Sequence, residues 1–173
     1  SNNNLMYREI KLGKLRAKWL LFTAMIGRSF KTQEKLASYA RRHKIRLAFV
    51  LSTYLARKGI RNLKSILKKT DVLTLNMEEA CLLVGKLKIE NILKKLSSFG
   101  PGIVAVTDGK NGVYVLDSKF LYFAKPNNIK VVETTGAGDA FAASFLSGIM
   151  KKNDTEFAIR LGMANAESVI QNH

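Results

Sequence analysis

The sequence has few of the residues that build cross-links and metal sites. Its 173 residues include one cysteine, Cys81, and two histidines, His43 and His173. A single cysteine cannot form a disulfide within the chain, so we expect Cys81 to be a small buried apolar residue on a helix. Because Cys and His do not cluster anywhere in the sequence, we expect no structural metal site.

Long apolar runs are also missing. The longest extends from Trp19 to Ile26, which is too short to cross a bilayer, and no signal peptide precedes it. We therefore expect a cytoplasmic protein with no membrane partner. Apolar residues make up 47% and charged residues 24%, as in ordinary globular domains. The length fits one domain, so we expect a polar linker-like end over residues 1–17 and one folded unit over residues 18–173.

Acidic residues are scarce in the first part of the chain. Lys and Arg number 29 against 13 Asp and Glu, a net charge of +16. Residues 1–70 contain 18 basic and 2 acidic residues, whereas residues 71–173 contain 11 of each. Such a surface can bind nucleic acid, but its cations are interspersed in amphipathic segments such as 31–44, as on solvated helix faces. A third interpretation is a missing acidic segment that covers this surface, and the sequence does not decide between the three.

The most informative stretch runs from Thr134 to Phe141 and reads Thr-Thr-Gly-Ala-Gly-Asp-Ala-Phe. Two glycines allow a tight turn, and the apolar run after them predicts a helix. The N–H groups of Gly136, Ala137 and Gly138 would lie at its positive end, which suits a phosphate. Asp139 is either an ordinary helix-start residue or the base for an attacking hydroxyl. Together these groups suit in-line phosphoryl transfer.

The rest of the chain alternates between apolar runs typical of strands and amphipathic helical patterns. Strands are predicted at 18–24 (buried), 45–51, 72–75, 103–107, 113–116, 120–124 and 129–132. Helices are predicted at 32–43 with Thr32 as N-cap, 62–69, 76–83, 137–150 and 155–171, and a further helix with apolar residues at 89, 92, 93 and 96 is expected to end near 100–102. Strand–helix–strand units followed by a late run of short strands predict a three-layer α/β/α fold, with a mostly parallel sheet and a mixed edge.

Two further motifs follow predicted strands. Asn76 follows strand 72–75, with Glu79 three positions later, and the segment Thr107 to Gly112 follows strand 103–107. Alone, Asn76 would be an ordinary N-cap, and Gly-Lys-Asn-Gly an ordinary hairpin turn. Ligands of open α/β sheets bind beyond the carboxyl ends of the strands, so we expect all three motifs on one edge.

The three motifs, in this order, resemble the ribokinase (PfkB) family of carbohydrate and nucleoside kinases. The resemblance runs from about residue 18 to the end and looks like the second half of a member. It implies a partial ribokinase-like domain that uses ATP and Mg²⁺ to phosphorylate a hydroxyl of a sugar or nucleoside. No Gly-x-x-x-x-Gly-Lys-Ser/Thr segment is present, so a P-loop kinase is excluded.

The resemblance also implies roles for individual residues. Asp139 would be the general base, and the N–H groups of residues 136–138 would hold the phosphoryl oxygens. Glu79 would act with Asn76 to orient magnesium-bound water and phosphates, which makes Glu79 the metal candidate. The residues expected at the nucleotide are Asn76, Thr107, Gly109, Gly112 and Asn165.

The chain departs from the family pattern in two places. Glu133 stands where the family usually has Asp near a monovalent-cation loop, and the segment that completes this loop would follow His173, which argues against potassium activation. Leu51-Ser52 replaces a frequent Asn-Pro. The absent first half would be a partner that carries most sugar contacts, and a homo-oligomer stays open. Two alternatives remain: a catalytically silent nucleotide-binding member of the family and a basic nucleic-acid-binding module.

Overall fold

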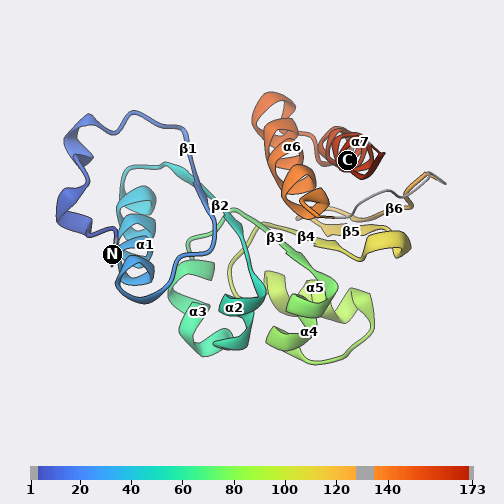
Figure 1. The fold of residues 1–173 in the computed structure, drawn as a ribbon, viewed down its shortest axis with the longest axis horizontal. Coiled ribbons are helices and arrows are strands. Elements are labelled where there is room, and N and C mark those ends of the chain that lie inside the picture. The colour runs from blue at the N-terminus through green and yellow to red at the C-terminus, as the bar shows by residue number, and fades with distance from the viewer. Residues whose placement is uncertain (1–3, 128–134, 172–173) are drawn as a thin grey trace.

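The core of the molecule is one sheet whose strands lie in chain order. The computed structural model describes residues 4–127 and 135–171 (Figure 1). The strands of this part are β1 (Trp19–Phe22), β2 (Arg46–Val50), β3 (Val72–Asn76), β4 (Ile103–Thr107), β5 (Val113–Leu116) and β6 (Leu121–Ala124). β1 to β4 pair in parallel, whereas β5 and β6 are antiparallel to their neighbours. The predicted parallel sheet with a mixed edge is confirmed.

Helices cover both faces of the sheet. They are α1 (Gly27–Arg42), α2 (Thr53–Arg57), α3 (Ile60–Leu67), α4 (Met77–Val84), α5 (Ile89–Ser97), α6 (Ala137–Lys152) and α7 (Thr155–Gln171). In Figure 1, α6 and α7 lie on one side of the sheet and α2 to α5 on the other, where α1 also packs. The predicted three-layer architecture is confirmed.

Side-chain alternation along β3 divides the core into two layers. Leu73 and Leu75 pack into the cluster formed with α1 to α5, whereas Val72 packs into the cluster formed with α6 and α7. In the second layer, α6 and α7 approach closely at Gly148, where a Cβ would lie 2.6 Å from the Cα of Ala158. Because α6 packs over β3, the first turn of α6 lies beside the ends of the central strands.

Two local expectations were wrong, and one short helix was missed. β1 was predicted to be buried, but it forms the edge of the described sheet and Leu21 is 47% exposed. α1 begins at Gly27 rather than after Thr32, which therefore lies inside the helix, where its hydroxyl donates to the carbonyl of Leu5 at 2.8 Å. α2 was not predicted. Its five residues are too few to show a helical period, and Ser52 caps it by accepting from the N–H of Leu55.

The first described residues pack on α1. The N–H of Leu5 donates to the Ser29 hydroxyl at 2.9 Å, and the Tyr39 hydroxyl donates to the carbonyl of Leu12 at 3.2 Å. Cys81 is half-buried and packs against the larger core cluster. The division of the chain at residue 17 stays a prediction.

The basic side chains of the first segment point to solvent. Lys31, Lys35 and Arg42 on α1 are exposed, as are Arg61 and most of the other cations of residues 4–70. This is the arrangement expected of solvated helix faces. Among the described residues, no helix is long and apolar enough to span a membrane.

Candidate functional site

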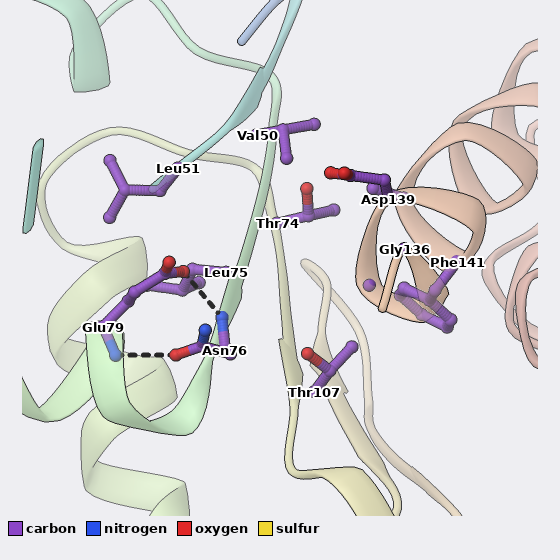
Figure 2. Close-up of a pocket in the computed structure, with 12 residues that line it drawn as sticks. Val50, Leu51, Thr74, Leu75, Asn76, Glu79, Thr107, Gly136, Asp139 and Phe141 are labelled. Carbon is purple, nitrogen blue, oxygen red and sulfur yellow. Dashed lines mark hydrogen bonds between the residues drawn. The ribbon is translucent and has the colours of Figure 1, made fainter. Parts of the chain in front are cut away.

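A pocket lies where the central parallel strands end (Figure 2). Its volume is about 180 Å³, and its walls come from the ends of β2, β3 and β4 and from the first turn of α6. Six of the ten predicted site residues line it: Asn76, Glu79, Thr107, Gly136, Gly138 and Asp139. The sheet therefore brings together three motifs that are far apart in the sequence.

The start of α6 forms one wall of this pocket. Gly136 is the N-cap residue and adopts a left-handed conformation with φ of 83°, which favours glycine. The first backbone hydrogen bond of the helix runs from the N–H of Ala140 to the carbonyl of Gly136, so the N–H groups of residues 136–139 have no partner within the helix. A Cβ at Gly136 or Gly138 would meet no atom within 4 Å, so the backbone is open to a ligand. These donors, at the positive helix end, suit an anion.

Asp139 lies in this first helical turn and is exposed. Figure 2 shows its carboxylate pointing across the pocket toward Val50 and Thr74. Ala137 sits between the two pocket-lining glycines on the same turn. A carboxylate beside several backbone donors can accept a proton from a hydroxyl while the donors hold a phosphoryl group.

Asn76 and Glu79 form the opposite wall. The N–H of Glu79 donates to Asn76 Oδ1 at 2.8 Å, and the N–H of Asn76 donates to Glu79 Oε2 at 3.0 Å (Figure 2). This reciprocal pair is a capping box at the start of α4. The expected N-cap role of Asn76 is thus present, and it also fixes the Glu79 carboxylate beside the pocket.

The environment of Glu79 favours a nearby cation. The side chain is only 6% exposed, and burial raises the pKa of its carboxyl above the usual value, an effect that hydrogen bonds from Asn76 and Thr53 reduce. In the described part of the chain no Lys, Arg or His forms an ion pair with it. A buried carboxylate without a cationic partner fits a divalent ion. Both oxygens already accept hydrogen bonds, which fits contact through metal-bound water better than a closed ligand shell.

The remaining predicted residues lie outside the pocket. Gly109 begins the 3₁₀ turn Gly109–Asn111, and Gly112 ends it with φ of 109°. A Cβ at Gly112 would lie 2.4 Å from the carbonyl oxygen of Ala124, so this glycine is required by the β5–β6 contact. Asn165 on α7 donates from Nδ2 to the carbonyl of Ala140 at 3.3 Å, which links α7 to α6.

Two expectations concern residues beyond the described ranges. The predicted strand at 129–132 and the departure at Glu133 both lie outside them. The described residues contain no group of three or more His, Cys, Asp or Glu side chains that could hold a metal ion. Glu79 therefore stays the metal candidate as a single carboxylate that lines the pocket.

Comparisons with known proteins agree with this geometry. The family model described as pfkB family carbohydrate kinase matches residues 28–173. The chain belongs to this family. It is 32% identical over 122 residues to the cytidine kinase of Thermococcus kodakarensis, a match that covers 68% of the chain and 42% of that protein. It is 35% identical over 118 residues to a sugar kinase of Archaeoglobus fulgidus, covering 68% of the chain and 47% of that protein.

A solved structure shows the same fold. The probable sugar kinase of Rhizobium etli superimposes with a TM-score of 0.85 at 25% identity, covering 96% of this chain and 52% of the other. The present PfkB chain thus spans about half the length of the proteins that it matches. Its relatives are kinases, so the family is one of phosphotransferases.

Sequence reasoning missed one residue that lines the pocket of this PfkB chain, Thr74, and one residue behind it that holds a pocket side chain, Thr53. Thr53, the first residue of α2, donates its hydroxyl to Glu79 Oε1 at 3.2 Å. Thr74, in the middle of β3, lines the pocket between the two walls. No spacing in the sequence points to Thr53, because α2 and α4 meet only in the folded chain. Thr74 stands two residues before Asn76 on the same face of the strand, and that alternation was the one available signal.

Proposed function

We propose that this chain is the nucleotide-binding part of an ATP-dependent kinase that phosphorylates a hydroxyl group of a sugar or nucleoside. The observation that carries the proposal is the position of Asp139 on the first turn of α6, beside open backbone N–H groups and facing the pocket. The cytidine kinase and the sugar kinase among its relatives support both acceptor classes. The cytoplasmic location stays a prediction.

In this proposal the residues of the first turn of α6 have separate tasks. The Asp139 carboxylate accepts the proton of the acceptor hydroxyl as that hydroxyl attacks. The N–H groups of residues 136–138 donate hydrogen bonds to the oxygens of the transferring phosphoryl group. Because these donors are part of the backbone, they need little reorganisation during the reaction.

Across the pocket, Asn76 and Glu79 would hold Mg²⁺ through its bound water. When bound, this ion neutralises charge on the phosphates. Glu79 stays oriented without it, because the capping box and Thr53 hold both carboxylate oxygens. Thr107 at the end of β4 completes this side of the pocket.

We propose that the acceptor is bound by a further segment that docks along β1. Within the described sheet β1 pairs only with β2, and Leu21 on β1 is 47% exposed. Parallel sheets are normally covered on both sides and extended by further strands, so this edge suits a partner strand. The sugar or nucleoside contacts would come from that segment.

The test is nucleotide binding by the purified chain. With Mg²⁺ and ATP at about a hundred times the dissociation constant, we expect the free energy of unfolding to rise by about 2.7 kcal/mol, measured as a higher melting temperature. A short DNA duplex at physiological salt is the control, and we expect no comparable shift. A thermal scan without any shift at millimolar Mg·ATP would contradict the proposal.

The division of labour has its own test. Because the chain has no acceptor-binding segment in this proposal, we expect little or no phosphorylation of sugars or nucleosides by the chain alone. Efficient sugar-dependent turnover by these 173 residues would overturn the division but not the nucleotide site.

A further inference from the structure

Thr74 has a buried hydroxyl group that forms no hydrogen bond within the part of the chain that the structure describes. Its side chain is 5% exposed, and among the described residues its Oγ1 has no hydrogen-bond partner. The backbone of Thr74 is satisfied, since its carbonyl accepts from the N–H of Leu51 at 2.9 Å. A buried hydroxyl without a partner loses its hydrogen bonds to water and gains none in return. A valine would have the same shape without this cost.

The neighbours of Thr74 on the sheet cannot supply a partner. Thr74 is paired with Val50 on β2 and with Ala105 on β4, and both side chains are apolar. Val72, two residues earlier on the same face of β3, packs into the cluster beneath α6. On the face of the sheet that α6 covers, the Thr74 hydroxyl is therefore flanked by the apolar side chains of its neighbours on β2, β3 and β4.

The hydroxyl points toward the wall of the pocket that carries Asp139. Both residues line the same cavity, and Figure 2 shows the oxygen of Thr74 directed toward the Asp139 carboxylate. The open N–H groups of residues 136–138 belong to the same turn as this carboxylate. A ligand oxygen held by these N–H groups would be within the part of the pocket toward which Thr74 is directed.

We propose that the Thr74 hydroxyl binds an oxygen of the transferring phosphoryl group, on the opposite side from the backbone donors of α6. The inference rests on the proposed function, and it adds a binding residue that the three motifs do not contain. Phosphate oxygens are strong acceptors, and a hydrogen bond to a charged acceptor is stronger than one between neutral groups. The bound nucleotide thereby supplies the partner that the free protein lacks.

The proposal predicts different effects of the Thr74 hydroxyl on the binding of ATP and of ADP. ADP lacks the terminal phosphoryl group, so the hydroxyl should matter for ATP and not for ADP. The variant Thr74→Val removes the hydroxyl and keeps the shape, whereas Thr74→Ser keeps the hydroxyl. Thr70→Val is the matched control, because Thr70 is equally buried at 3% exposure but its hydroxyl donates to the carbonyl of Ile66 at 3.0 Å.

The measurement is titration calorimetry with Mg²⁺ and either ADP or the non-hydrolysable imido analogue of ATP, together with the melting temperature of each free variant. We expect Thr74→Val to weaken the affinity for the ATP analogue about tenfold or more and to leave that for ADP within about twofold. Thr74→Ser should bind like the wild type. Free Thr74→Val should melt at or above the wild-type temperature, whereas Thr70→Val should melt lower and keep both affinities.

Each contrary result has a separate meaning. Equal affinity of Thr74→Val and wild type for the ATP analogue overturns the role of Thr74 alone, and so does an equal loss for both nucleotides. A clear fall in the melting temperature of free Thr74→Val would mean that the hydroxyl is structural, which also overturns it. A wild-type chain that binds neither nucleotide overturns the proposed function and this inference together.

Discussion

The hydroxyl of Thr53 donates a hydrogen bond to Glu79 Oε1 at 3.2 Å and so ties α2 to the first turn of α4. The backbone N–H of Asn76 holds the other carboxylate oxygen at 3.0 Å. A buried carboxylate is thus fixed by neutral donors among the described residues, and burial raises its pKa above the usual value for a glutamate. Without a nearby cation, burial therefore makes the charged form of Glu79 unfavourable, and a bound cation would stabilise that form.

The variant Glu79→Gln should separate the charge of this residue from its capping role. Glutamine can still accept from the N–H of Asn76, so the capping box is retained. Because the folded pKa lies above the unfolded one, the stability due to neutral Glu79 is lost as pH rises from about 4.5 through the raised value. The melting temperature of Glu79→Gln relative to wild type should therefore increase from pH 4 to about pH 7.

The same variant should weaken the response to Mg²⁺. Without the carboxylate, we expect the Mg²⁺-dependent part of ATP affinity to fall about tenfold, as is typical when a residue that orients a metal ligand is lost. Glu78→Gln is the control, since Glu78 lies on the same turn and is exposed. If Glu79→Gln bound Mg·ATP as tightly as the wild type, Glu79 would have no part in the metal site.

The hydrogen bonds of Asp117 should make the stability of the protein depend on pH in the acid range. Its Oδ1 accepts from the N–H groups of Lys119 and Phe120 at 2.8 Å, and its Oδ2 accepts from the hydroxyls of Tyr122 and Thr155. Burial alone would raise the pKa of Asp117, but these hydrogen bonds outweigh it and hold the pKa below 3.8. The stability from the charged form is present above about pH 3.8 and is lost as pH falls through the lowered pKa.

Asp117→Asn should lower the melting temperature at pH 7 by about 2–4 °C, because it weakens the connection between the β5–β6 turn and α7. The difference from wild type should shrink toward pH 3 and below, where Asp117 itself becomes protonated. Glu156→Gln is the control, since Glu156 forms only an exposed pair with Arg160 and should change little. A difference that stays constant from pH 7 to about pH 3 would contradict this role of the Asp117 charge.

The order of elements and the edge at which the motifs meet were predictable from the sequence, because both follow from local patterns. The apolar run at 72–75 and the polar Asn76 directly after it predict a buried strand that ends at a helix start, and β3 and α4 have this arrangement. Asn76 was likewise expected as an N-cap, and the structure adds the reciprocal hydrogen bond to the Glu79 carboxylate that completes a capping box. Because the carboxyl ends of parallel strands lie at the same edge of a sheet, motifs that follow these strands in the sequence meet there.

The features that sequence reasoning missed depend on contacts between distant segments. Thr32 is a residue type that often caps helices, yet its hydroxyl donates to the backbone carbonyl of Leu5, 27 residues away. Thr74 is an ordinary strand former, and only the apolar neighbours that the register gives it make its hydroxyl unusual. The place of Asn165 at the nucleotide stays a prediction, and what the sequence did not show is that its amide donates to the carbonyl of Ala140 on α6.

Asp139 should be the residue on which turnover depends once an acceptor-binding segment is present. Asp139→Asn keeps the shape and the N–H groups of the helix start but removes the proton acceptor. Loss of a general base costs about 10²- to 10⁴-fold in turnover, or roughly 3–5 kcal/mol of transition-state stabilisation, whereas nucleotide affinity should change little. If Asp139 only starts α6, asparagine serves as well, and stability and turnover should both stay nearly unchanged. Turnover and Mg·ATP affinity measured on the same variant of the complete enzyme decide between these outcomes, and turnover within a few fold of the parent would remove Asp139 from catalysis.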